Sequence, residues 1–310
     1  SPHPPAALVP FAWGTNRSGD SRVLYSSAPP SWHEVAASAT AISDIAMSGA
    51  SVGLAVGYGG AVYRYHAELN QWLSANNASD DIPAALDLYS VASGDASTFW
   101  IGGAGGLIFY SDDGGRAFEQ VGSAPATFVD AIAAIGAQTA YAATDSVQVL
   151  RTTDAGSTWT THPLPGGMRL SNLVALDSDS LWATSPSGAI LRTDDAAANW
   201  TNQLPANSES MPGLSVLSPT AAFAMSGDGD VYSTTDSGTN WTLVQSLSAP
   251  LNVLVMASST EGYALGDNGR IFMTTNGWTT STSQIFGTQT YASGTSITSS
   301  HIVTAGSGGK

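Results

Sequence analysis

The chain has no cysteine, only one lysine and few charged residues. Its 310 residues include no Cys, and Lys310 is the single lysine. The absence of cysteine excludes a disulfide framework, thiolate zinc sites and a cysteine nucleophile. Charged residues make up only 11% of the chain, so Ser, Thr, Asn and Gly must supply most of the polar surface. No run of 18 apolar residues is present, which excludes a membrane-spanning helix.

Positive charge is also scarce. Acidic residues outnumber basic ones 24 to 9, which gives a net charge of −15. Because such a chain repels phosphate groups, we expect no nucleic-acid partner and no insertion into an anionic membrane. An acidic, lysine-poor surface on a chain that begins at Ser1 without Met is typical of an exported protein. We therefore expect a secreted or periplasmic protein whose signal peptide has been removed.

The sequence is built from an internal repeat. Successive blocks end at an aromatic residue, with spacings of 40, 46, 41, 41, 41 and 37 residues, at Trp32, Trp72, Phe118, Trp159, Trp200, Trp241 and Trp278. A period of this length is typical of propeller blades or of helical arrays. Each block consists of short Val, Ile, Ala and Tyr runs separated by Gly, Ser, Asn and Asp, which favours strands.

One block shows the order of its elements clearly. Apolar runs at 170–176 and 181–184 are followed by a Gly-containing turn at 185–188 and a third run at 189–193. The residues after Trp200 supply a fourth strand. Four antiparallel strands joined by short turns form one blade of a β-propeller.

The turn after the third strand carries the pattern Ser/Thr-x-Asp-x-Gly-x-x-Trp, known as the Asp box. The copies at 152–159 and 234–241 match fully, and the copy at 111–118 has Phe in place of Trp. The copy at 193–200 has Ala197 in place of Gly, and 274–278 looks like a shortened version. An Asp can accept backbone N–H bonds of its own turn, and Gly can adopt a left-handed conformation. We therefore predict a structural role for the motif residues Asp113, Gly115, Phe118, Asp154, Gly156, Trp159, Asp195, Trp200, Asp236, Gly238, Trp241, Asn276 and Trp278.

The blocks predict an all-β, seven-bladed β-propeller of four-stranded blades, in one domain spanning residues 1–310. Six blades are expected at about 42–76, 88–122, 128–162, 170–203, 211–245 and 251–283. The two ends of the chain each hold only half a block. We expect residues 291–309 and 8–36 to combine into a closing blade, because joining the ends removes open sheet edges.

The motif resembles that of the Asp-box (BNR) propellers, which include sialidases, sortilin-type receptors, xyloglucan-cleaving glycosidases and photosystem II stability/assembly factors. Blade length, chain size and runs such as 188–193 (Gly-Ala-Ile-Leu-Arg-Thr) are most similar to the assembly-factor family. The resemblance implies a propeller, but it implies little about activity, because one propeller scaffold supports many functions.

The residues that an enzyme would need are hard to find. A sialidase resembling the family would need three converging arginines, yet Arg64, Arg151 and Arg192 share one position of the repeat on the outer part of the blade. The five histidines have no metal-ligand spacing, so we predict no metal and no cofactor. A glycosidase would need two facing carboxylates, and the many aspartates leave that alternative open.

We therefore expect an exported, non-catalytic propeller that binds another macromolecule, as an assembly factor or a structural protein. The partner would be a protein or a glycan. The alternative is a carbohydrate-active propeller, either a lectin or a glycoside hydrolase that uses an Asp pair. The predicted binding site is the mouth of the central channel, where acids and amides precede or begin the first strands of five blades: Asp44, Asp87, Asp130, Asn172 and Asn252. These could instead be turn residues that cap the starts of strands.

Overall fold

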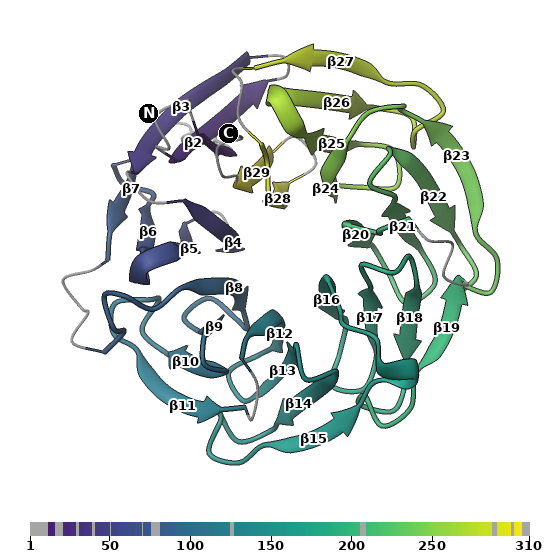
Figure 1. Cartoon of the computed structure of the whole chain (residues 1–310). Coiled ribbons are helices and arrows are strands. Elements are labelled where there is room, and N and C mark those ends of the chain that lie inside the picture. The colour runs from purple at the N-terminus through teal and green to yellow at the C-terminus, as the bar shows by residue number, and fades with distance from the viewer. Residues whose placement is uncertain are drawn as a thin grey trace, which may run out of the picture.

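The computed structural model describes residues 12–15, 21–28, 31–38, 41–49, 51–69, 71–75, 81–124, 127–204, 209–286, 290–298 and 301–305. These residues form short β-strands with a few 3₁₀ turns, and the sheets are arranged in a ring around a central channel (Figure 1). Within this part of the chain, no helix is long and apolar enough to cross a bilayer.

Six sheets of the ring are four-stranded blades, and each follows the chain from its innermost to its outermost strand. The first three blades consist of β4 (Ile42–Ser48), β5 (Val52–Gly57), β6 (Val62–His66) and β7 (Gln71–Ser74); β8 (Leu88–Ser93), β9 (Phe99–Gly103), β10 (Leu107–Ser111) and β11 (Glu119–Ser123); and β12 (Val129–Ile135), β13 (Thr139–Thr144), β14 (Gln148–Thr152) and β15 (Thr160–Pro163). The next three consist of β16 (Asn172–Ala175), β17 (Leu181–Thr184), β18 (Ile190–Thr193) and β19 (Thr201–Leu204); β20 (Gly213–Val216), β21 (Ala222–Met225), β22 (Asp230–Thr234) and β23 (Thr242–Ser246); and β24 (Leu251–Met256), β25 (Gly262–Gly266), β26 (Arg270–Thr274) and β27 (Thr282–Ile285).

The prediction of seven four-stranded blades is wrong, because the structure shows six. The rest of the ring is a five-stranded sheet made by both chain ends, in the order β28 (Ser293–Thr298), β29 (His301–Ala305), β1 (Ala12–Thr15), β2 (Ser21–Ala28) and β3 (Ser31–Ser38). Two strands were expected from each chain end, and β1 is an additional strand. This short strand lies between the two halves, parallel to β29 and antiparallel to β2. Residues 8–11, 16–20, 29–30, 299–300 and 306–309 of the expected closing blade lie outside the described residues.

Each blade has two distinct ends. Because neighbouring strands are antiparallel, the turns between second and third strands lie at the same end as the connections to the next blade. We call this end the rim face, and it includes the 3₁₀ turns η1 (Tyr58–Gly60), η3 (Pro165–Gly167) and η4 (Asp267–Gly269). The hairpins that carry the Asp boxes lie at the opposite end, which we call the Asp-box face.

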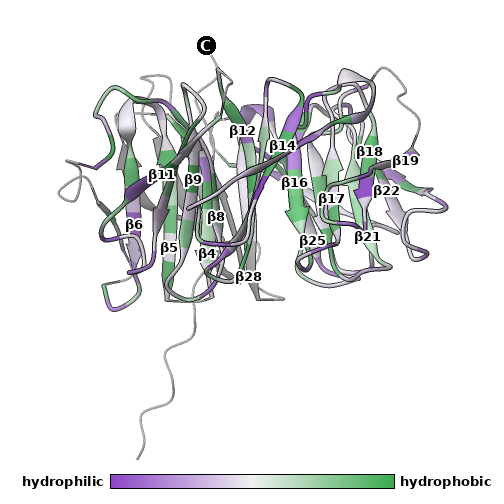
Figure 2. Ribbon diagram, turned by 90° about the horizontal axis from the view of Figure 1, so that it is seen from below, coloured by the Kyte–Doolittle hydropathy of each residue, from purple (hydrophilic) through white to green (hydrophobic). Residues whose placement is uncertain are grey.

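The core lies between adjacent blades, and hydrophobic residues run along the middle of the strands (Figure 2). Trp100, Tyr141 and Trp182, in the middle of second strands, are completely buried. The Asp-box residue Trp159 packs edge-on against Trp100 of the preceding blade, with ring centroids 6.0 Å apart. Its Nε1 donates to the Val121 carbonyl of that blade at 3.1 Å. The Asp-box tryptophan therefore joins two blades, rather than only the two strands of its own hairpin.

The Asp box at 152–159 shows how the hairpin is held. The Asp154 carboxylate accepts the Thr158 N–H at 2.9 Å and the Thr158 hydroxyl at 2.6 Å. The Gly156 N–H donates to the Thr152 hydroxyl at 2.9 Å, with Gly156 at φ +84°. Hydrogen bonds from Thr158 are the main cause of the lowered pKa of the Asp154 carboxyl. In this hairpin the Asp-box polar groups bond within their own turn, as a structural motif requires.

The sixth blade corrects one sequence assignment. The Trp278 N–H donates to the Thr274 hydroxyl at 2.9 Å, which is the bond that Gly156 makes to Thr152. Trp278 therefore occupies the glycine position, with φ +66°, and its fully buried ring donates from Nε1 to the Met256 sulfur at 3.0 Å. The hairpin has its full length and is not shortened. The expectation of a shortened motif was wrong, because Trp278 does not correspond to the final Trp of the other copies. The correct alignment starts from Thr274, which matches Thr152.

Candidate functional site

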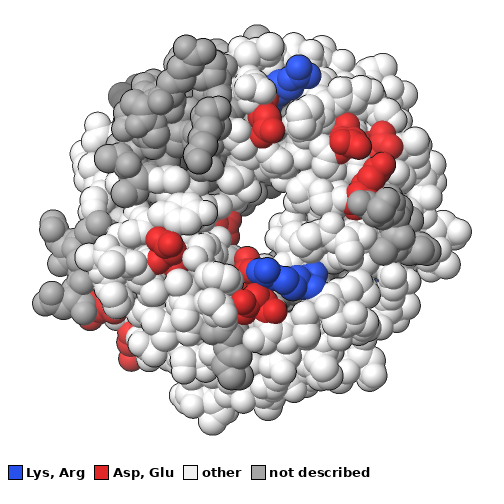
Figure 3. All heavy atoms as spheres, in the orientation of Figure 1, with Lys and Arg blue, Asp and Glu red and all other residues white. Residues whose placement is uncertain are grey.

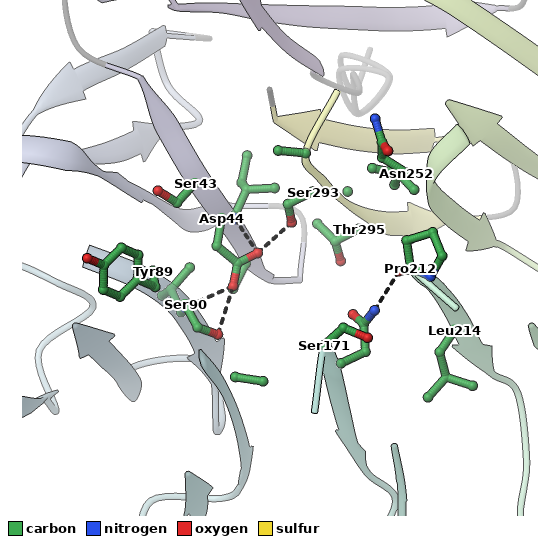
Figure 4. Close-up of a pocket in the computed structure, with 18 of the residues that line it drawn as sticks. Ser43, Asp44, Tyr89, Ser90, Ser171, Pro212, Leu214, Asn252, Ser293 and Thr295 are labelled. Carbon is green, nitrogen blue, oxygen red and sulfur yellow. Dashed lines mark hydrogen bonds between the residues drawn. The ribbon is translucent and has the colours of Figure 1, made fainter. Parts of the chain in front are cut away.

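A cavity of about 780 Å³ opens where the first strands of the blades surround the channel (Figures 3 and 4). Four of the five predicted residues, Asp44, Asp130, Asn172 and Asn252, line this cavity. The fifth, Asp87, immediately precedes β8 and lies outside the lining. The structure therefore brings most of the predicted set to one place, around a predominantly polar lumen.

A β-bulge sets the register of these residues. In four blades the second residue of the first strand is an extra, unpaired residue: Ser43, Tyr89, Asp130 and Asn252. Such a bulge redirects side chains locally. Asp44 lies one residue after the bulge and Asp87 two residues before it, so the predicted acids do not form one equivalent ring. Aligning the buried residues before the bulge, such as Ile42 and Leu88, would have identified Ser43 and Tyr89 as lining residues.

Asp44 is the most extensively bonded carboxylate of the site. It accepts the Val91 N–H at 2.8 Å and the Ser90 hydroxyl at 3.0 Å from the second blade. It also accepts the Ile45 N–H at 2.8 Å and the hydroxyl of Ser293 in the terminal sheet (Figure 4). Burial raises the pKa of Asp44, although these hydrogen bonds oppose the shift. The side chain therefore joins the terminal sheet to the first two blades.

The other three predicted residues that line the cavity are also held by protein partners. Arg169 forms a two-point ion pair with Asp130, from Nη2 at 2.5 Å and from Nε at 3.1 Å. Burial nevertheless raises the pKa of Asp130, with Arg169 opposing the shift. The Asn172 amide donates to the Pro212 carbonyl of the next blade. The Asn252 amide donates to Asp267 of η4 at 3.0 Å.

A row of aromatic rings on the rim face was missed by sequence analysis. Tyr58 of η1 is 45% exposed and meets Tyr89 edge-to-face at 6.2 Å. Tyr89 in turn meets Phe128 edge-to-face at 5.3 Å. Asp87 lies beside the row and accepts the Gly59 N–H at 2.9 Å. The pKa of Tyr89 is raised, first by burial and then by the negative charge of Asp87. The repeat hides this row, because each ring stands at a different position of its blade.

The carboxylates of Asp44 and Asp130 at the channel mouth are occupied by protein partners. Asp44 is surrounded by hydrogen-bond donors and Asp130 is paired with Arg169, so neither resembles an open acid–base pair. In the part of the chain that the structure describes, no three His, Asp or Glu side chains are grouped so that they could hold a metal ion.

Two of the three arginines that share one position of the repeat bond between blades, and Arg151 donates from Nε to the Tyr141 hydroxyl of its own blade at 2.9 Å. Arg64 donates from Nε to the Gly114 carbonyl of the next blade at 2.6 Å. Arg192 donates from Nη1 to the Ser237 carbonyl of the next blade at 3.2 Å. Gly114 and Ser237 each directly follow the aspartate of an Asp box. Arg64 and Arg192 therefore clamp neighbouring hairpins at separate places around the ring and do not converge on one anion.

Fold and site together define a β-propeller whose hairpins carry Asp boxes and whose polar channel mouth is bordered by aromatic rings. Residues 157–275 match the family model described as photosynthesis system II assembly factor YCF48. This match confirms the resemblance to the assembly-factor family that the Asp box indicated. No curated protein matched the chain.

Several solved structures share the fold. The structure of YCF48 bound to a D1 peptide aligns with a TM-score of 0.73 and 17% identity, over 87% of this chain and 91% of that one. YCF48 from Cyanidioschyzon merolae aligns with a TM-score of 0.69 and 13% identity, over 87% and 94%. A GH74 enzyme from Niastella koreensis aligns with a TM-score of 0.68 and 15% identity, over 96% of this chain but only 52% of that enzyme.

Proposed function

We propose that this protein is a non-catalytic propeller that binds a segment of another protein on its rim face, as an assembly factor does. The observation that carries the proposal is the state of the polar and aromatic side chains at the channel mouth. Its carboxylates are held by protein donors, while aromatic rings beside them remain partly exposed. Such a surface is organised for recognition instead of acid–base chemistry.

The comparisons support this proposal in one respect. A propeller of similar fold was solved with a D1 peptide, so this architecture can hold a peptide ligand. The central cavity of about 780 Å³ and the aromatic row offer a peptide two adjoining kinds of surface, one polar and one apolar.

An exported location is the second part of the proposal. It is supported by the single lysine and the excess of 24 acidic over 9 basic residues. Fractionation of the host cell, followed by detection with an antibody, tests this part. Recovery of the protein only with cytoplasmic markers would contradict it.

The alternative is a carbohydrate-active propeller, and the likeness to the GH74 enzyme favours it. The chain, however, aligns with only 52% of that enzyme. Two experiments separate the two functions. Parallel arrays of peptides and glycans measure binding, and assays on plant and bacterial polysaccharides measure hydrolysis. We expect reproducible binding to peptides and no hydrolysis. Reproducible cleavage of a polysaccharide would overturn the non-catalytic proposal.

A further inference from the structure

The aromatic row lies directly beside negative charge on the rim face. Tyr58 belongs to the first blade, Tyr89 to the second, and Phe128 precedes the first strand of the third. Tyr89 also lines the central cavity, as does Asp130. The row therefore crosses three blades and connects an exposed ring with the channel mouth.

The spacing of the rings suits an extended peptide. Their centroids are 6.2 Å and 5.3 Å apart, and alternate side chains of an extended strand are about 6.6 Å apart. Successive rings are nearly perpendicular, at 81° and 86°. A flat sugar-stacking platform would present its ring faces in one direction, whereas these rings are in edge-to-face contact and face different directions. The row therefore suits the side chains of a peptide better than a stack of pyranose faces.

The charge beside the row identifies the side chain that fits. Asp87 and Asp130 both contribute negative potential at the Tyr89 hydroxyl and raise its pKa, after the larger effect of burial. Asp130 is already paired with Arg169, whereas the carboxylate of Asp87 is oriented by the Gly59 N–H next to Tyr58. A guanidinium group combines stacking on an aromatic ring with hydrogen bonds to a carboxylate, and it is less strongly hydrated than an ammonium group.

We infer that Tyr58, Tyr89, Phe128 and Asp87 form an arginine-reading site for an extended segment of a partner protein. The inference rests on the proposed function and adds the chemistry of the partner. The bound arginine lies against Tyr58 and pairs with Asp87, while apolar or aromatic side chains of the segment pack beside Tyr89 and Phe128. The net charge of −15 further favours a cationic partner segment.

Fluorescence anisotropy with a labelled heptapeptide, Thr-Tyr-Thr-Arg-Thr-Tyr-Thr, tests the inference. A version with Glu in place of Arg measures the preference for positive charge. A version with Lys keeps the charge and measures the preference for the shape of the guanidinium group. We expect the Arg peptide to bind tighter than the Lys peptide, and at least about tenfold tighter than the Glu peptide, at low salt. Equal binding of the Arg and Glu peptides would overturn the arginine site while leaving protein binding intact.

Two variants probe the site without disturbing the core. Tyr58→Ala should weaken binding of the Arg peptide about five- to tenfold, because it removes an exposed aromatic anchor. Asp87→Asn keeps an oxygen that can accept the Gly59 N–H but removes the charge, so it should weaken binding and reduce its salt dependence. Leu69→Ala is the matched control, because Leu69 is 55% exposed in the same blade at the Asp-box face.

The outcomes separate the two proposals. If both rim variants bind the Arg peptide as wild type does, or if the wild type does not bind it, the arginine site is wrong. Binding of other peptides on an array would then still support a protein partner. If a xylo-oligosaccharide binds, none of the three peptides displaces it, and Tyr58→Ala abolishes that binding, then the rim face is a glycan site and both proposals fail.

Discussion

The two ends of the same blades use aspartate in opposite ways. At the Asp-box face, Asp154 and Asp236 receive their hydrogen bonds from residues two to four positions away, and the pKa of each carboxyl is lowered. At the rim face, most of the hydrogen bonds of Asp44 and the ion pair of Asp130 come from residues far away in the chain, and burial raises the pKa of each carboxyl. An aspartate that is satisfied within its own turn forms the scaffold. An aspartate that is satisfied between blades instead holds neighbouring blades together.

The largest expected effect is at the Asp-box face. Trp159→Ala removes a ring that packs on Trp100 and a hydrogen bond to Val121. We expect a loss of about 3 kcal/mol in the free energy of unfolding, measured by chemical denaturation, because truncation of a packed tryptophan leaves a cavity. Binding of the folded fraction to peptides should be unchanged. If Trp159→Ala lost peptide binding without losing stability, the Asp box would belong to the binding interface. The contrast between a structural Asp-box face and a binding rim face would then be wrong.

Although Asp44 lies at the rim face, we expect it to stabilise the ring of blades and not to bind a partner. Asp44→Ala leaves the N–H groups of Val91 and Ile45 without their acceptor. We expect a loss of about 2 kcal/mol in unfolding free energy, the cost of unsatisfied buried donors, offset in part by removing a buried charge. Ser293→Ala removes only one of the four bonds and should cost less. Equal stability of Asp44→Ala and wild type would show that Asp44 does not hold the ring together.

The opposite pKa shifts predict opposite pH dependences. The hydrogen-bonded Asp195 has its pKa lowered to about 2, so its stabilising contribution is present above pH 3.8 and is lost as the pH falls towards 2. Asp44 has a raised pKa, so its contribution is most favourable below pH 3.8 and declines as the pH rises through its folded-state pKa. Melting temperatures measured from pH 2 to 7 should therefore fall at the acid end because of Asp195, and Asp44 should lower them as the pH rises through its folded-state pKa.

Asp195→Asn isolates the Asp-box contribution. The sixth blade already has an Asn here: Asn276 accepts the Thr280 N–H at 2.9 Å and donates to the Thr280 hydroxyl at 2.8 Å. The amide should therefore keep the hairpin folded at neutral pH while flattening the decline in melting temperature below pH 4. An unchanged acid decline in this variant would mean that Asp195 does not contribute to it.

The smallest expected effect concerns the backbone of the fourth blade. Ala197 takes the glycine position with φ +69° and is fully buried. Ala197→Gly relieves a left-handed strain of about 1 kcal/mol but loses a buried methyl worth nearly as much, so stability should change by less than about 1 kcal/mol. Gly156→Ala is the contrasting variant, since an added Cβ would meet Val121 Cβ at 2.6 Å. We expect only the second change to destabilise the protein clearly in denaturation experiments.

The sequence predicted those parts of the structure that repeat. Six blades, and the Asp-box hairpins of the last five, follow from a period and a motif whose hydrogen bonds are local. The bulge that places Ser43 and Tyr89 in the channel was not predicted, because one extra residue shifts the register without changing the composition, and only an alignment on the apolar residues before it reveals the shift. Trp278 and β1 were misjudged because each departs from the repeat. The aromatic row joins residues that are close only after three blades are assembled, so no local pattern marks it.

The central claim is that a partner segment binds the rim face and not the Asp-box face. Photo-crosslinking tests this claim directly. One Tyr of the Arg heptapeptide is replaced by benzoylphenylalanine, and mass spectrometry then locates the adducts. The account predicts adducts within residues 58–60, 87–89 and 127–130, reduced in Tyr58→Ala and unchanged in Leu69→Ala. Adducts concentrated in the hairpins at 112–118 and 153–159 would contradict it.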